Sequence, residues 1–156
     1  MCWSELDLGA GTWTLPAERS KNHRAHTVTL PPAALAIIKA VPRSDRDQLF
    51  GERAEGFTSW TRGKTALDQR LGDAVKPWRL HDIRRSVATG MADIGIEPHV
   101  IEAALNHYSG HRRGVAGVYN RSNYASQVKS ALQRWSGHVL DLVEGRESTI
   151  IPLHAS

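Results

Sequence analysis

The stretch from Leu80 to Ile94 constrains the fold of this chain more than any other, because its apolar residues recur at a helical spacing. These residues lie three or four positions apart, as on the buried face of an amphipathic helix; they are Leu80, Ile83, Val87, Met91 and Ile94. His81 and Arg84 each follow one of them by one residue, about 100° further round a helix, so we expect both on one flank. Such a flank could bind an anion with several oxygens, such as a phosphodiester. Taken alone, the pair is more simply interpreted as an exposed histidine and an exposed arginine.

The length and composition of the chain limit its class. Its 156 residues correspond to about one domain. No run approaches the roughly 20 apolar residues of a membrane-spanning helix, and the first residues lack the basic and apolar regions of a signal peptide. Cys2 is the one cysteine of the sequence and cannot form an internal disulfide, which favours a cytoplasmic protein without a thiolate metal site.

Positive charge is unevenly distributed along the chain, whose net charge is +4. The window from Ala103 to Leu140 contains no acidic residue, and its basic residues include Arg112, Arg113, Arg121, Lys129 and Arg134. A second basic concentration runs from Arg62 to Arg85, although three aspartates dilute it. Phosphate neutralisation dominates the affinity of proteins for nucleic acids, so this distribution indicates polyanion binding. On charge alone, a merely solvated surface is an equal alternative.

The remaining patterns predict a mainly helical fold with a small antiparallel sheet near the N-terminus, either a hairpin or three strands. Alternation of polar and apolar residues indicates strands at 12–15 and 25–30, and 3–8 is a strand or the end of a helix-to-strand connection. Residues 20–24 would then be a hairpin tip that carries Lys21, and Leu49 with Phe50 could add an edge strand. Helices are expected at 31–41, 58–71, 80–95, 97–107 and 123–143. The two helices joined at Gly95 could also form a helix-turn-helix.

Four short motifs in this order resemble the catalytic domain of the tyrosine recombinases, the phage integrase family. They are Arg19-Ser20-Lys21-Asn22 at the hairpin tip, His81-Asp82-Ile83-Arg84-Arg85 with Thr89, Leu105-Asn106-His107, and Val118-Tyr119-Asn120-Arg121. The resemblance spans roughly residues 3–135. It implies that residues 1–145 are a partial recombinase catalytic domain of α+β type, followed by a tail at 146–156.

The resemblance also implies the chemistry. Tyr119 would attack a DNA phosphodiester to form a 3′-phosphotyrosyl link, with Arg84, His81 and His107 as donors to the phosphate and Lys21 as the acid that protonates the leaving 5′-oxygen. The partner would be double-stranded DNA, and no cofactor or metal is required. Further DNA contacts are expected from Arg24, Arg85, Arg112, Arg113 and Arg121. Tyr108 and Tyr124 are alternative nucleophiles, but Tyr119 precedes Asn-Arg as the family pattern does.

Histidine pairs could suggest a metal instead. His107 and His111 are separated by Gly110, which disfavours an unbroken helix, and no Glu-rich or Cys partner is near them. His23 and His26 lie near a turn and are expected to face DNA or to be merely exposed. We therefore expect no metal site.

One departure from the family pattern concerns its first catalytic arginine, which lies on a helix ahead of the Trp3-Ser4-Glu5-Leu6-Asp7 segment. We therefore expect a recombinase domain truncated at its N-terminal side, without the family's N-terminal DNA-binding domain, and inactive alone. A non-catalytic DNA-binding remnant or a helix-exchange module are the alternatives. Self-association is expected through the helix at 123–143 or through an uncovered apolar face near the N-terminus, formed by Trp3, Leu6, Leu8, Trp13 and Leu15.

Overall fold

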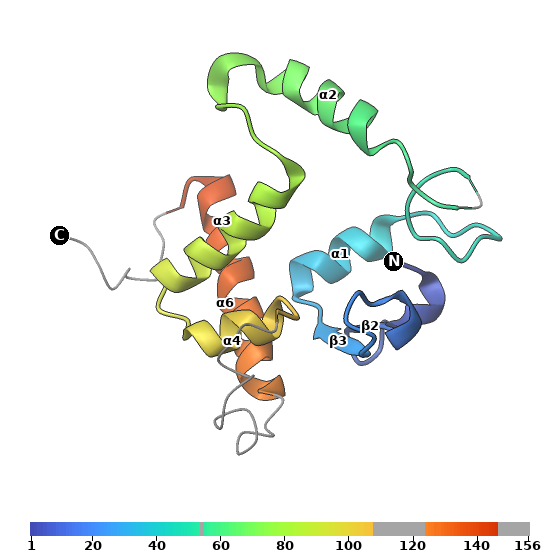
Figure 1. The fold of residues 1–156 in the computed structure, drawn as a ribbon, viewed down its shortest axis with the longest axis horizontal. Coiled ribbons are helices and arrows are strands. Elements are labelled where there is room, and N and C mark those ends of the chain that lie inside the picture. Colours follow the sequence, from blue (N-terminus) through green and yellow to red (C-terminus); the bar gives the residue numbers. More distant parts are fainter. Residues whose placement is uncertain (54, 108–123, 147–156) are drawn as a thin grey trace.

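The computed structural model describes residues 1–53, 55–107 and 124–146 (Figure 1). In chain order the elements are η1 (Trp3–Glu5), β1 (Leu6–Asp7), β2 (Thr12–Leu15), η2 (Ala17–Arg19), β3 (His26–Thr29), α1 (Pro32–Ala40), α2 (Trp60–Leu71), η3 (Gly72–Ala74), α3 (Leu80–Asp93), α4 (Pro98–Ala104) and α6 (Ala125–Glu144), where η denotes a 3-10 helix. The predicted fold class, mainly helical with a small antiparallel sheet near the N-terminus, is confirmed. Within the described residues, no helix is both long and apolar enough to cross a membrane.

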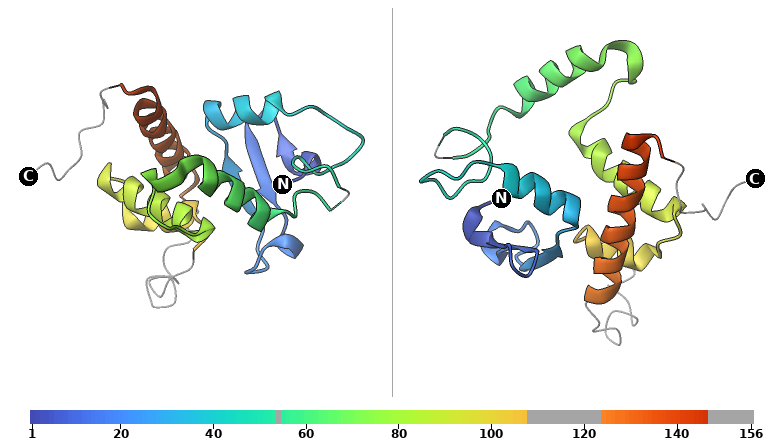
Figure 2. Two further views of the ribbon diagram at one scale, coloured as in Figure 1. Left: turned by 90° about the horizontal axis from the view of Figure 1, so that it is seen from above. Right: turned by 180° about the vertical axis from the view of Figure 1, so that it is seen from behind.

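The sheet is antiparallel, with the strand order β1-β2-β3. Trp13 pairs with Leu6 on one side and with Val28 on the other, so the apolar residues of the three strands lie in register. Helix α1, which begins at a proline as sequence patterns favour, lies along this sheet (Figure 2). The two enclose a small core of Trp3, Leu30, Ile38 and Leu49, with Leu6, Leu8 and Trp13 packed against it. The apolar N-terminal face that we expected to be uncovered is therefore largely covered by this chain itself.

Leu49 and Phe50 do not form the predicted edge strand. Backbone pairing at this place is limited to an isolated bridge between Cys2 and Gln48, supported by a 3.1 Å hydrogen bond from the Leu49 N–H to the Met1 carbonyl. Leu49 is buried as a core residue, whereas the Phe50 side chain is exposed. The apolar pair thus reflects one core contact rather than a strand.

A second core lies between α3, α4 and α6 (Figure 1). Its buried residues are Met91, Ile94, Ile96, Val100, Ile101, Val128 and Ala131. The predicted buried stripe of α3 is confirmed only from Val87 onward, because Leu80 and Ile83 are 43% and 52% exposed. The core residues of α3 come from its second half alone, so the first turn carries apolar residues without cover.

Helix α2 stands apart from both cores in Figure 1 and in the right view of Figure 2, and none of its residues is buried. Its first residue, Trp60, meets the ring of Phe57 edge to face at 4.9 Å between centroids. Lys64 lies 4.4 Å above the ring of Trp78, in the segment that leads to α3. These two ring contacts connect the helix to the segments on either side of it.

Candidate active site

The hairpin tip between β2 and β3 is held by its own polar groups. Ser20 is buried, only 5% exposed, and its hydroxyl donates to the Asn22 side-chain oxygen at 2.6 Å. The same oxygen accepts the Arg24 backbone N–H at 3.2 Å, and the His23 N–H donates to the Ser20 carbonyl at 3.0 Å. Lys21 lies exposed between these fixed residues. The predicted tip position of Lys21 is thus confirmed, and the loop that carries it is ordered by hydrogen bonds of the kind that make Asx turns.

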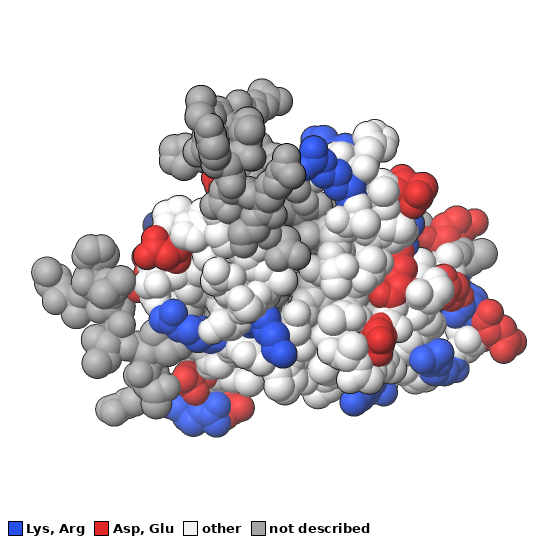
Figure 3. Space-filling model, turned by 90° about the horizontal axis from the view of Figure 1, so that it is seen from below, with Lys and Arg blue, Asp and Glu red and all other residues white. Residues whose placement is uncertain are grey.

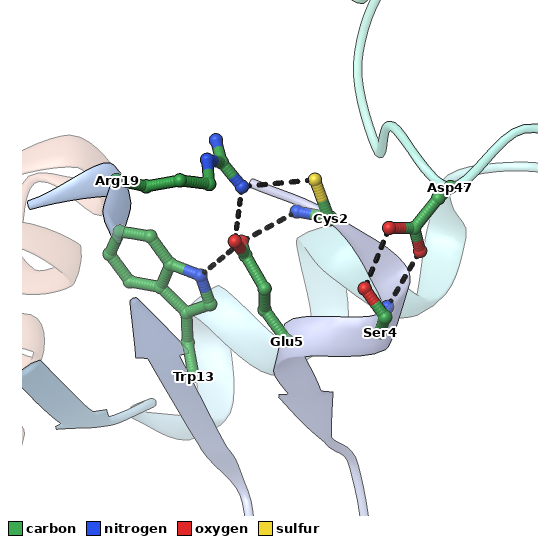
Figure 4. A network of polar contacts seen from close by, with 6 residues as sticks. All are labelled: Cys2, Ser4, Glu5, Trp13, Arg19 and Asp47. Atoms are coloured by element: carbon green, nitrogen blue, oxygen red, sulfur yellow. Dashed lines mark hydrogen bonds and ion pairs between the residues drawn. The ribbon is translucent and has the colours of Figure 1, made fainter. Parts of the chain in front are cut away.

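The base of the tip is fixed to the sheet through Glu5 (Figure 4). Its carboxylate accepts hydrogen bonds from the Trp13 indole N–H at 3.0 Å and from the Cys2 N–H at 2.9 Å, and pairs with Arg19. Burial raises the pKa of the Glu5 carboxyl, but these hydrogen bonds and the charge of Arg19 outweigh burial and lower the pKa below its ordinary value. Glu5 therefore stays ionised and keeps Arg19, two residues before Lys21, against the sheet.

Arg84 turns from α3 toward the end of α4. Its guanidinium donates to the Leu105 carbonyl at 2.6 Å, and the side chain is half-buried. His81 lies on the same helix three residues earlier, which places it on the same side, and it is exposed. The Arg84 guanidinium thus uses one N–H group to fix its own position, and it has further N–H groups that can donate to a ligand.

The turn after α4 meets the hairpin tip. Asn106 has a left-handed backbone, with φ 50°, and its side-chain oxygen accepts the Asn22 amide N–H at 3.0 Å. His107 follows directly and is exposed, and its own backbone N–H donates to the Glu102 carbonyl at 2.8 Å. A pocket of about 340 Å³ is lined by His26, Glu102, Asn106 and His107 among others.

His26 was expected to face DNA or to be merely exposed, and the structure corrects the second of these expectations. It is half-buried beside Arg84 and not simply exposed, and its ring donates to the Ala104 carbonyl. Burial and the charge of Arg84 lower the pKa of His26, and they outweigh the hydrogen bond, which raises it. Strand alternation was the signal that could have placed it, since His26 opens β3 opposite Leu15.

Several predicted residues lie outside the described residues: the nucleophile Tyr119 and the basic residues Arg112, Arg113 and Arg121. Of the predicted DNA contacts within the described ranges, Arg24 is exposed on the hairpin tip and Arg85 is exposed on α3, where it pairs with Asp82 at 3.4 Å. Arg134, counted in the basic window, donates to the Ile94 carbonyl at 2.5 Å. It therefore joins α6 to the end of α3 in addition to carrying charge.

The face of the molecule drawn in Figure 3 carries mixed charge. On the face drawn in Figure 3, basic and acidic side chains are interspersed, and the described part of that face shows no continuous basic patch. Residues 1–53, 55–107 and 124–146 also contain no group of three or more His, Cys, Asp or Glu side chains that could hold a metal ion. The arrangement around Arg84 instead offers cationic and amide donors, which suit an anion with several oxygens.

Comparison with known proteins identifies relatives of this chain. The model of the phage integrase family matches residues 1–126. Prophage integrase IntA of Escherichia coli (strain K12) is 34% identical over 160 residues, covering 99% of this chain and 37% of the relative. Prophage integrase IntZ of the same organism is 24% identical over 162 residues, covering 96% and 37%. No solved structure matches.

The extent of these matches decides the family. The family model covers most of the chain, including the hairpin tip, Arg84 and the turn after α4. The chain spans 37% of the length of the two curated relatives. The chain belongs to the phage integrase family.

Proposed function

We propose that this chain takes part in DNA integration and site-specific recombination by breaking and rejoining DNA through a 3′-phosphotyrosyl intermediate. The supporting observation is the convergence on the turn after α4. Arg84 donates to the Leu105 carbonyl, Asn22 beside Lys21 donates to Asn106, and His107 completes the turn. Residues 1–145 would be part of the catalytic domain and 146–156 a tail.

In the proposed reaction the phenol oxygen of Tyr119 attacks the phosphorus of a DNA phosphodiester. A bond forms between these atoms, and the bond from phosphorus to the 5′-oxygen breaks. The phenol is a weak nucleophile at its free pKa of about 10, so nearby cations must favour its oxyanion. The freed 5′-hydroxyl, or one from another strand, attacks the phosphotyrosyl link in reverse.

Lys21 has the role of donating the proton that the 5′-oxygen takes as it leaves. Arg84, His81 and His107 have the role of donating hydrogen bonds to the phosphate oxygens, where negative charge grows in the transition state. These side chains supply the cationic donors themselves, so the proposed reaction uses no cofactor or metal.

The resemblance calls for two arginines at the phosphate, and the candidate residues of this chain supply one, Arg84. Loss of one such donor typically lowers the rate by a factor of about 10² to 10³. We therefore propose that the 156-residue chain alone forms the covalent adduct slowly or not at all on ordinary DNA. A non-catalytic DNA-binding module is the alternative.

A nicked DNA that cannot be rejoined after cleavage tests this function. One substrate carries an ordinary phosphate at the cleaved position and the other a methylphosphonate, which has one negative charge less and needs less cationic stabilisation. We expect more adduct on the methylphosphonate, none with Tyr119→Phe, and an unchanged yield with Tyr124→Phe. Adduct lost with Tyr124→Phe would overturn the choice of nucleophile, and binding without adduct on either DNA would favour the alternative.

We also propose that the chain self-associates through α6 and acts in the cytoplasm. The support for self-association is that the last turns of α6 expose Leu142 and Val143.

The support for the cytoplasm is the single cysteine, Cys2, which suits a reducing compartment.

A further inference from the structure

The turn at Leu105–Asn106 receives hydrogen bonds from two distant parts of the chain. Arg84 on α3 donates to the Leu105 carbonyl at 2.6 Å, and Asn22 on the hairpin tip donates to the Asn106 side chain at 3.0 Å. Asn22 and Asn106 are 84 residues apart in sequence, and their hydrogen bond is partly buried. This bond is a direct link between the loop that carries Lys21 and the turn that carries His107.

The Asn22 side chain is oriented by the loop in which it lies. Its oxygen accepts the Ser20 hydroxyl and the Arg24 N–H, so its NH₂ group is left to point away from the loop. The NH₂ group of Asn22 donates to the side-chain oxygen of Asn106. The two hydrogen bonds that the Asn22 oxygen accepts lie on either side of Lys21 in the sequence, because Ser20 donates one of them and Arg24 donates the other. A shift of Asn22 would therefore move Lys21.

Asn106 meets two requirements of the turn after α4, a left-handed backbone and a side-chain acceptor for Asn22. Its φ of 50° lies in the left-handed region, which glycine and asparagine adopt most readily. Glycine would satisfy the backbone but has no side-chain acceptor. Asparagine satisfies the backbone and also provides the oxygen that Asn22 requires.

We propose that Asn106 is a positioning residue that fixes the Lys21 loop relative to Arg84 and His107. The consequence for catalysis rests on the proposed function, in which Lys21 protonates the leaving 5′-oxygen. A general acid must lie within hydrogen-bond reach of the atom that it protonates. A displacement of about 1 Å can lower a rate by roughly 10²-fold. The Asn22–Asn106 bond thus sets the acid with respect to the groups that hold the phosphate.

Two substitutions separate the side chain of Asn106 from its backbone. Asn106→Gly keeps the left-handed turn and removes the acceptor, whereas Asn106→Asp keeps an oxygen that can accept the Asn22 N–H. Thermal unfolding of both variants shows whether the fold is retained. Asp is the matched control, because its side chain has nearly the same shape.

The first measurement is independent of activity. Backbone ¹⁵N relaxation of the whole chain reports the order of residues 20–24. With Asn106→Gly we expect their order parameters to fall from about 0.85 to below about 0.6, with the wild-type values retained in Asn106→Asp and in α4. Equal order in the wild type and in Asn106→Gly would overturn the proposal.

The second measurement asks whether the effect passes through Lys21. Adduct formation is compared on two nicked methylphosphonate DNAs, one with the leaving 5′-oxygen and one in which sulfur replaces that oxygen, since a 5′-thiolate leaves without a proton. We expect Asn106→Gly to lose about 10- to 100-fold in rate on the 5′-oxygen substrate and to match the wild type on the sulfur substrate, with unchanged DNA affinity. An equal loss on both substrates would overturn the assignment to Lys21. If the wild type forms no adduct on either DNA, the proposed function fails, and the relaxation measurement alone decides the role of Asn106.

Discussion

His26 and Arg84 bind neighbouring carbonyls of one segment, since the His26 ring donates to Ala104 and Arg84 donates to Leu105. Burial and the charge of Arg84 hold the pKa of His26 below 6.5. We predict that NMR titration of the His26 ring gives a midpoint below that value, and that Arg84→Gln raises the midpoint because one positive charge is removed. Arg85→Gln, which removes an exposed arginine on α3, should leave it unchanged.

The same shift predicts how stability depends on pH. Below pH 6.5 the unfolded chain protonates His26 before the folded chain does. The contribution of the neutral ring to stability is therefore complete above pH 6.5 and is lost as the pH falls through the folded pKa. Denaturant unfolding between pH 7 and pH 5 should show this loss, and His26→Gln should reduce it. A titration midpoint at or above 6.5 would contradict the burial of the ring beside Arg84.

The sequence predicted where Lys21 and Arg84 lie in the fold, but it did not predict the hydrogen bonds that hold their segments in place. A polar loop between two alternating strands locates a hairpin tip, and helical spacing locates a flank, so both residues followed from local patterns. The bond between Asn22 and Asn106 joins residues far apart in sequence, which no local pattern encodes. The environment of His26 likewise depends on residues far away in sequence, Arg84 of α3 and Ala104 of α4.

At the scale of elements, the packing of α6 on α3 depends on Gly90. A Cβ atom built there would lie 2.4 Å from the Trp135 ring, so alanine would force the two helices apart. We predict that Gly90→Ala destabilises the fold by about 1–3 kcal/mol, although alanine favours an isolated helix by about 1 kcal/mol. Chemical denaturation measures the free energy of unfolding of the wild type and of this variant.

Gly137 on α6 is the matched control, because a Cβ atom there meets nothing within 4 Å. Gly137→Ala should therefore stabilise the fold by up to about 1 kcal/mol through helix propensity alone. Equal effects at the two glycines would mean that Trp135 does not pack against α3 as the structure has it.

The elements themselves were mostly predictable, and the differences have tertiary causes. The hairpin and the helices follow from periodicity and from prolines at helix starts. The first turn of α3 has the apolar spacing of a buried face, yet Leu80 and Ile83 are exposed because the residues that cover α3 pack on its second half. Leu49 is buried without a strand, since its side chain joins the Trp3 cluster while the backbone pairing beside it is an isolated bridge between Cys2 and Gln48.

At the scale of the whole molecule, DNA binding should depend on individual exposed arginines, because basic and acidic side chains are interspersed on the described part of the face in Figure 3. We predict that affinity falls steeply with salt, with a slope of log K against log salt of about −0.9 for each phosphate contacted. Arg85→Gln should weaken binding and reduce the slope by about one such unit. Fluorescence anisotropy with duplex DNA at several salt concentrations measures both.

Arg146 provides the control for this experiment, since its guanidinium pairs with two carboxylates, Asp141 and Glu144, whereas that of Arg85 pairs with one, Asp82. Arg146→Gln removes the same charge from a place where acidic partners already neutralise it, so the slope should stay unchanged. Binding that is insensitive to salt would contradict the phosphate contacts, and an equal effect of both substitutions would mean that only net charge matters.

The end of α6 determines our last expectation, that copies of this chain associate. Leu142 and Val143 are 64% and 76% exposed in the last turn before Gly145, whereas the apolar residues near the N-terminus are largely covered by α1 and Leu49. We predict that sedimentation velocity shows mass increasing with concentration, and that Leu142→Glu with Val143→Glu shifts the chain toward the monomer because charge opposes apolar burial. Ile37→Glu, at a 65% exposed position on α1, is the control and should leave association unchanged. A monomer at every concentration, or an equal effect of the control, would mean that α6 does not mediate association.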